Sequence, residues 1–242
     1  MSRIMDKWLV STYRGKDCDL SVTDLTRPTT QLWAKLHTPC NEDEEEKRVG
    51  LKSFLGSALH KFIEDIDEDG VVKEFSWVKT MEDGTRIGGT ADELRWRYSI
   101  KAWRLGDIKL KGDYPTRKFL GIGNKSDPSP PPEQEKEQLQ LSIYRWLFNE
   151  MFNIDDKAVI YLFTAGRPNY AKYPEYQEVW VDLLPVLTVD TYIKSKIAQA
   201  KQDKPPTRDC AAWLCDYCEY HDACPYAPEE KKTGGFGDET KG

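Results

Sequence analysis

The chain has 242 residues, 39% of them hydrophobic and 31% charged, which is ordinary for a soluble globular protein of one large domain or two small ones. The formal net charge of −6 argues against a protein that binds nucleic acid through a basic surface alone. No run approaches the ~20 apolar residues of a membrane span, and the first ten residues lack the apolar core of a signal peptide, so we expect neither a membrane anchor nor secretion.

Two helical segments are predicted in the N-terminal quarter. Ser21-Val-Thr-Asp24 is typical of a helix start that Thr23 or Asp24 caps, and a helix begins near Pro28, which is tolerated only in a first turn. The apolar residues of this segment are Leu25, Leu32, Trp33 and Leu36. A second helix is predicted over residues 51–65, with Leu55, Leu59, Phe62 and Ile63 at helical spacing and His60 beside them.

Three strands are predicted next. The first covers residues 71–81 and is followed by the turn signal Glu82-Asp-Gly84. The second runs from Arg86 to Leu94 and the third from Ile100 to Leu110. The short polar segment between the last two predicts a hairpin that brings Asp92 beside Asp107. Glycines 88 and 89 in the second strand allow a close approach, either of a phosphate backbone or at a bulge.

The remaining core alternates helices and strands. Residues 111–132 carry glycines, prolines and lysines, and we predict either a basic flap that contacts phosphates or a plain linker. A helix over residues 133–152 places Gln140 and Tyr144 one turn apart on one face. Strands at 158–164 and 178–184 and a helix at 189–202 follow. This order predicts an α/β fold whose central mixed β-sheet is flanked by helices.

Two carboxylates that meet at one point, here Asp92 and Asp107, repel each other and call for a cation. Oxygen ligands suit a hard ion such as Mg²⁺ or Mn²⁺. Lys109 projects to the same side as Asp107, because strand side chains repeat every two residues. Its ammonium can orient a water molecule or stabilise developing negative charge. An Asp-x-Lys pattern alone is also typical of the solvent-exposed face of an antiparallel strand.

The C-terminal region concentrates cysteines: Cys210, Cys215, Cys218 and Cys224 lie within fifteen residues. Thiolates favour zinc or iron–sulfur clusters, and without a secretion signal this density indicates metal ligation rather than disulfides. Cys210 would close a local four-cysteine site, whereas Cys40 or Cys18 as the fourth ligand would join the two ends of the domain. His221 is a further candidate ligand for zinc.

An ordered set of motifs resembles the PD-(D/E)XK nucleases, in particular the RecB-like, CRISPR-associated-type exonuclease branch with a C-terminal cysteine cluster. In chain order the motifs are Gly56-Ser-Ala-Leu-His60, Gly89-Thr-Ala-Asp92, Asp107-Ile-Lys109, Gln140-Leu-Ser-Ile-Tyr144 and Cys215-x2-Cys218-x5-Cys224. The resemblance covers roughly residues 21–225. The segment that begins at Ser21 and the Trp213-Leu-Cys-x-x-Cys ending resemble phage-encoded members.

The resemblance implies a restriction-endonuclease-like core and a metal-dependent deoxyribonuclease, an exonuclease that acts on single strands or ends in the cytoplasm of a prokaryotic or phage-infected cell. It implies Mg²⁺ or Mn²⁺ held by His60, Asp92, Asp107 and the carbonyl of Ile108. The implied catalytic residues are Asp92, Asp107, Lys109, Gln140 and Tyr144. The cysteines would hold a [4Fe–4S] cluster, with structural Zn²⁺ as the alternative. We favour Cys210 as the fourth ligand because Thr26-Arg27-Pro28 offers no cysteine where other members carry one.

Three regions are expected. Residues 1–208 form the nuclease core, with an N-terminal helical part at about 21–65; residues 209–226 form the cysteine segment, and residues 227–242 a disordered tail. The alternative function is a DNA-binding accessory module of a recombination, replication or CRISPR-adaptation complex with little or no cleavage. In both cases the partner is DNA, as single strands or ends rather than intact duplex, together with proteins of such a complex.

Overall fold

The computed structural model describes residues 18–38, 51–66, 68–123, 130–218, 220–221 and 224–227. The chain divides into two compact units: unit 1 comprises Met1–Thr26 and Asn41–Ser195, and unit 2 comprises Arg27–Cys40 and Lys196–Gly242. The tail predicted from residue 227 lies almost wholly outside the described residues, as do Cys40 and the acidic run at 42–46. No helix in the described ranges combines the length and the apolar character that crossing a membrane requires.

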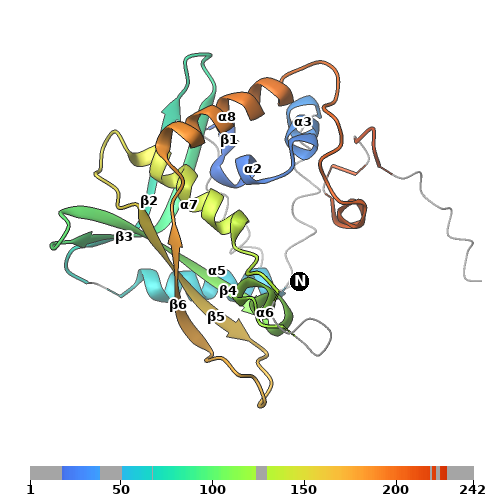
Figure 1. The fold of residues 1–242 in the computed structure, drawn as a ribbon. Coiled ribbons are helices and arrows are strands. Elements are labelled where there is room, and N and C mark those ends of the chain that lie inside the picture. Colours follow the sequence, from blue (N-terminus) through green and yellow to red (C-terminus); the bar gives the residue numbers. More distant parts are fainter. Residues whose placement is uncertain are drawn as a thin grey trace, which may run out of the picture. The chain divides into compact units, whose positions relative to one another are not determined.

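Unit 1 is an α/β fold with a central mixed sheet flanked by helices, as the sequence predicts (Figure 1). Its strands are β1 (Leu20–Ser21), β2 (Val71–Thr80), β3 (Arg86–Arg97), β4 (Ala102–Gly112), β5 (Lys157–Ala165) and β6 (Tyr176–Asp182). Strand β3 pairs antiparallel with both β2 and β4. Strand β4 pairs parallel with β5, and β5 pairs antiparallel with β6. The short β1 runs parallel to β3.

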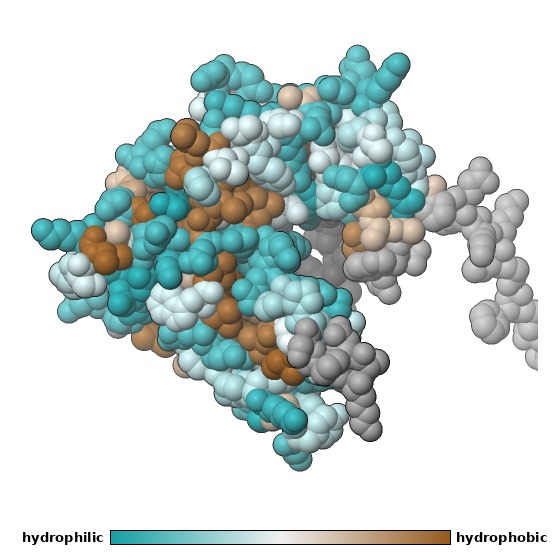
Figure 2. Space-filling model, in the orientation of Figure 1, coloured by the Kyte–Doolittle hydropathy of each residue, from teal (hydrophilic) through white to brown (hydrophobic). Residues whose placement is uncertain are grey.

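Helix α7 (Glu135–Phe148) packs across β2, β3 and β4 and also contacts α2 (Val22–Thr26). Its buried residues include Leu141, Ile143, Trp146, Leu147 and Phe148. Helix α8 (Val186–Ala200) is tied to α7 by the hydrogen bond that the indole Nε1 of Trp146 donates to Asp190, at 3.0 Å. The space-filling view shows apolar patches on a face that is otherwise largely hydrophilic (Figure 2).

Helix α2 begins with a reciprocal cap. The hydroxyl of Ser21 accepts the Asp24 N–H at 3.1 Å, and the Asp24 carboxylate accepts the Ser21 N–H at 2.8 Å. This is the capping-box arrangement, in which the side chain of each residue accepts the otherwise unpaired backbone N–H of the other. Ser21 is therefore the capping residue, and the expectation that Thr23 or Asp24 takes this position was wrong.

Residues 113–120, which we expected to be part of a basic loop, form helix α6 (Asp113–Leu120). Pro115 is accommodated because it lies in the first turn, where a helix has no hydrogen bond to lose. Gly121 ends the helix in the left-handed conformation at φ +66°, where its N–H returns to the carbonyl of Lys118 at 3.1 Å. The glycines and the proline thus delimit a helix instead of excluding one.

Unit 2 contains α3 (Thr29–His37) and the segment that leads to the short 3₁₀ helix η2 (Ala212–Tyr217). Helix α3 starts directly after Pro28, as predicted. The Asp209 carboxylate accepts the N–H groups of Thr29 and Thr30 at 2.5 and 3.1 Å, and Trp33 donates to the carbonyl of Gln202 at 2.8 Å. These bonds hold the cysteine segment to a helix some 180 residues earlier in the chain.

Candidate functional site

The β3–β4 hairpin places Asp92 beside Asp107, as the sequence predicts. The register pairs Glu93 with Gly106 and Leu94 with Leu105, so Asp92 and Asp107 are the next two residues in the series. The Asp92 carboxylate accepts the backbone N–H of Ile108 at 2.7 Å. Burial, together with the charge of Asp107, raises the pKa of Asp92 to about 6, because neither carboxylate is well solvated here.

His60 reaches the same place from helix α5 (Leu51–Glu64). Its Nδ1 lies 3.5 Å from Oδ1 of Asp92, and its Nε2 lies 3.2 Å from the carbonyl oxygen of Ile108. Burial alone would lower the pKa of His60, but the carboxylates of Glu74 and Asp92 outweigh burial and raise it. The imidazole is therefore flanked by acids, and it can either pair with them as a cation or join them as a neutral metal ligand.

Glu74, on β2, is a member of this cluster that the sequence analysis missed. Its Oε1 lies 3.9 Å from Nδ1 of His60, and His60, Glu74 and Asp92 each offer a ligand atom within 4.8 Å of the others. Glu74 has a backbone φ of +50°, which is unusual for a residue other than glycine and costs about 1–3 kcal/mol. The sequence did contain a signal for Glu74. When residues are paired across a hairpin whose turn is centred on Asp83, residue 74 falls opposite residue 92, and the observed flanking pairs Lys73–Glu93 and Phe75–Ala91 agree with this register.

Asp107 and Lys109 lie side by side on β4. The ammonium of Lys109 donates to Oδ1 of Asp107 at 2.9 Å. Although burial would lower the pKa of Lys109, the charge of Asp107 raises it, so the group is a cation at neutral pH. Oδ2 of Asp107 is buried and has no hydrogen-bond partner within the described parts of the chain. A buried, unsatisfied carboxylate oxygen is costly unless a further group, such as a cation, completes it.

Tyr144 faces the acids from helix α7. Burial, with smaller effects from Asp92 and Asp107, raises its pKa, whereas the hydrogen-bonding side chain of Gln140 partly offsets the rise. The phenol is thus a proton donor at neutral pH. Of the predicted catalytic residues, Tyr144 lies within electrostatic reach of the acids, and Gln140 joins them through Tyr144.

Side chains of neighbouring elements occupy the space beside Gly88 and Gly89, for which the sequence suggested a phosphate backbone or a bulge. A Cβ atom on Gly89 would lie 2.8 Å from Cε1 of Tyr144 and 2.6 Å from Cγ2 of Val22. A Cβ atom on Gly88 would lie 2.8 Å from Sγ of Cys18. The close approach that these glycines allow is therefore made by packed side chains, and Gly89 sets the distance at which Tyr144 stands from β3.

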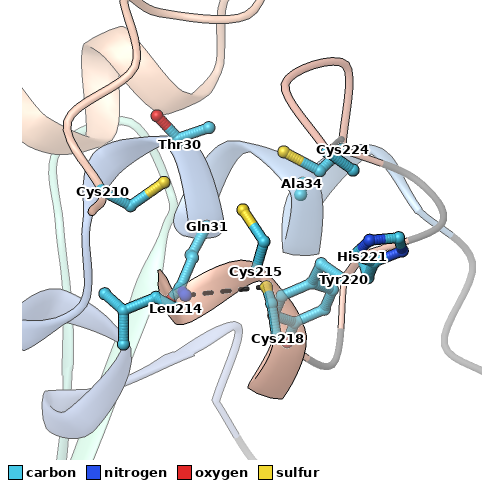
Figure 3. A pocket seen from close by; sticks show the side chains of 11 residues that line it. Thr30, Gln31, Ala34, Cys210, Leu214, Cys215, Cys218, Tyr220, His221 and Cys224 are labelled. Atoms are coloured by element: carbon cyan, nitrogen blue, oxygen red, sulfur yellow. Dashed lines mark hydrogen bonds between the residues drawn. The ribbon is translucent and has the colours of Figure 1, made fainter. Parts of the chain in front are cut away.

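Four predicted cluster ligands converge within unit 2. A pocket there is lined by Cys210, Cys215, Cys218 and Cys224, with His221, Gln31 and Thr30 also on its wall (Figure 3). None of these four cysteines forms a disulfide within the described residues, and the thiols of Cys210, Cys215 and Cys224 point toward the same space. Of the two alternatives for the fourth ligand, Cys18 is in unit 1, and Cys40 lies outside the described residues.

Comparison with family models gives a match over residues 122–225 to the PD-(D/E)XK nuclease superfamily. Over these residues the chain is similar to that superfamily. The matched range includes Gln140, Tyr144 and the four cysteines of unit 2, and it begins after Asp107 and Lys109. The match therefore does not cover the acidic residues, whose arrangement is known from the geometry described above.

The fold also has a counterpart among solved structures. A structure described as "Crystal structure of SSO0001" superposes with a TM-score of 0.59 and is 20% identical in sequence, covering 93% of this chain and 96% of that chain. At this identity the likeness shows the fold alone. Comparison with curated proteins gave no match.

Proposed function

We propose that this chain is a metal-dependent deoxyribonuclease that hydrolyses DNA phosphodiester bonds, acting as an exonuclease on single strands or ends. The observation that carries the proposal is the convergence of His60, Glu74 and Asp92, each with a ligand atom within 4.8 Å of the others. Asp107 adds a buried oxygen that lacks a partner among the described residues. The match of residues 122–225 to the nuclease superfamily supports the same reaction class. The preference for single strands or ends rests on the resemblance to RecB-like exonucleases.

The donor set fits a hard divalent cation. Carboxylate oxygens suit Mg²⁺ and Mn²⁺, and an imidazole ligand is compatible with Mn²⁺. A cation held by His60, Glu74, Asp92 and Asp107 would offset the repulsion that raises the pKa of Asp92 to about 6. The carbonyl of Ile108, next to His60, is a further candidate donor. When bound, the ion would polarise the scissile phosphate and favour the hydroxide form of the attacking water.

Lys109 and Tyr144 complete the proposed active site. Because Lys109 is held as a cation by Asp107, it serves to orient the attacking water and to stabilise negative charge on the phosphate, rather than to remove a proton. Tyr144 stays protonated and can donate a hydrogen bond to a phosphate oxygen. Gln140 positions the Tyr144 hydroxyl.

For the cysteine pocket we propose a [4Fe–4S] cluster ligated by Cys210, Cys215, Cys218 and Cys224. The alternative is a single zinc ion, whose four sulfur ligands would lie about 3.8 Å apart given a Zn–S distance of about 2.3 Å. Within the described ranges, no three cysteine sulfurs lie within 4.8 Å of one another. The preference for a cluster over a single ion rests on the resemblance of the Cys215-x2-Cys218-x5-Cys224 spacing to the iron–sulfur members of the family.

The test is cleavage of end-labelled and circular DNA, single- and double-stranded, with Mg²⁺, Mn²⁺ or EDTA. We expect the wild-type protein to degrade linear single strands with either metal and to leave circles intact. Asp107→Asn and Lys109→Met should abolish cleavage, whereas Asp182→Asn, which removes an exposed charge from the same sheet, should not. Cleavage that persists in EDTA would contradict the metal mechanism. DNA binding without cleavage in any condition would favour an accessory binding module instead.

A further inference from the structure

Arg208 lies at the cysteine pocket of unit 2. Arg208 lies two residues before Cys210, and the next residue, Asp209, is anchored on the first turn of α3. The hydroxyl of Thr30 also donates to the Asp209 carboxylate, at 2.8 Å. With Asp209 fixed by three bonds, the backbone that carries Arg208 and Cys210 has a defined place relative to α3.

The guanidinium of Arg208 contacts the thiols directly. Its Nη2 donates to Sγ of Cys215 at 3.2 Å. A hydrogen bond to Cys210, and the nearby thiols of Cys215 and Cys224, raise the pKa of the guanidinium. Its Nε is buried and has no acceptor within the described parts of the chain. One donor is therefore available to an acceptor that a bound group would bring, such as an inorganic sulfide.

Donors of this kind change the chemistry of a thiolate site. Four thiolates concentrate negative charge, and a cationic donor offsets it through charge-assisted hydrogen bonds. Hydrogen bonds to the sulfurs and the net charge of the site set the reduction potential of an iron–sulfur cluster. Gln31 offers a neutral contrast, because its amide donates to Sγ of Cys218 at the longer distance of 3.6 Å (Figure 3).

We propose that Arg208 is a positioning residue of the cysteine site: it orients Cys210 and Cys215, offsets the thiolate charge, and thereby raises both the retention and the reduction potential of the bound cluster. This inference rests on the proposed ligation of a [4Fe–4S] cluster by the four cysteines. It assigns Arg208 no contact with DNA and no part in phosphodiester hydrolysis.

The experiment compares full-length wild-type protein with Arg208→Gln, Arg208→Lys and Lys204→Gln, all purified without oxygen. Lys204 is an exposed cation of the same unit and serves as the matched control. Iron content, visible absorption, reduction potential and the rate of iron loss to a chelator are measured. We expect Arg208→Gln to shift the potential downward and to lose iron several-fold faster. Arg208→Lys should restore most of the potential, because the charge remains, and part of the retention.

The outcomes separate the two proposals. Equal potentials and equal rates of iron loss in Arg208→Gln and Lys204→Gln would overturn the role of Arg208. Faster iron loss with an unchanged potential would reduce Arg208 to a structural contact and overturn the role in tuning. A wild-type protein that holds zinc instead of iron would overturn the cluster. The role of Arg208 would then be read from the rate of zinc loss, expected several-fold faster in Arg208→Gln. A wild-type protein with neither metal would overturn both.

Discussion

Glu74 lies opposite Asp92 across the antiparallel strands β2 and β3, and it does so with a backbone φ of +50°. Like charges directly opposite each other destabilise a sheet, and a left-handed glutamate adds strain. Neither feature helps the fold. Both features are explained if Glu74 and Asp92 hold a cation, because the free energy of cation binding then offsets the charge repulsion and the backbone strain of the metal-free protein.

The first prediction concerns Glu74 as a metal ligand. Glu74→Gln keeps the backbone and the size of the side chain but removes the charge, so we expect Mn²⁺ to bind at least about tenfold more weakly. The measurement is the rise in melting temperature with Mn²⁺ concentration, because a ligand that binds only the folded state stabilises it. Glu178→Gln, an exposed acid on β6, is the control. Equal Mn²⁺ responses in the two variants would remove Glu74 from the site.

The second prediction concerns the pH dependence of stability in EDTA. The pKa of Asp92 is raised from the ordinary value of 3.8 to about 6, so the folded protein binds this proton more tightly than the unfolded chain does. The free energy of unfolding therefore falls as the pH rises from about 4 to 6, and the whole penalty is present at pH 7.

Asp92→Asn removes that penalty. A shift of this size is worth roughly 1–3 kcal/mol, so the variant should be more stable than the wild type at pH 7 and nearly equal to it at pH 4. Chemical denaturation across this range measures the difference. A difference that does not change with pH would show that Asp92 is not held in a raised-pKa state.

The third prediction contrasts two glycines. Gly89→Ala would press a Cβ atom against Tyr144 and Val22, at 2.8 and 2.6 Å, so we expect a loss of about 1–3 kcal/mol in unfolding free energy. Gly56 lies inside α5, and a Cβ atom added there would meet no atom of the described residues within 4 Å beyond its chain neighbours and the backbone of its own helix. Gly56→Ala should instead stabilise the protein by about 0.5–1 kcal/mol. Equal effects would contradict the packing of Tyr144 on Gly89.

The parts of the site that depend on hairpin pairing near a turn could be predicted from the sequence, whereas the residue that depends on the packing of a further strand was missed. Alternation and a short turn are enough to set Asp92 against Asp107, because strand pairing in a hairpin is counted from the turn. The same count also reaches Glu74, but this residue lies in the middle of the strand predicted over residues 71–81 and alternates with the apolar Val72 and Val78, so nothing local marks it as a ligand. Helix α6 was missed because Pro115 and Gly121 were interpreted as breakers, although they occupy its first turn and its C-terminal end.

The fourth prediction concerns the anchor of the cysteine segment. Asp209→Ala removes the acceptor for the Thr29 and Thr30 N–H groups and should cost about 1–2 kcal/mol. Although burial would raise the pKa of Asp209, its bonds to Thr30 and Thr29 lower it, so this stabilisation persists at neutral pH and is lost only in acid. Faster hydrogen exchange of the α3 amides measures the effect. Asp203→Ala, an exposed acid nearby in the sequence, should leave exchange unchanged.

The central claim is that one divalent ion binds where β2, β3, β4 and α5 bring their acids and imidazole together. Anomalous diffraction from a crystal soaked in Mn²⁺ tests it most directly. We predict a manganese peak in contact with His60, Glu74, Asp92 and Asp107, and its loss in Asp107→Asn. A soaked crystal with no peak at these residues, or with manganese bound only elsewhere, would contradict the account.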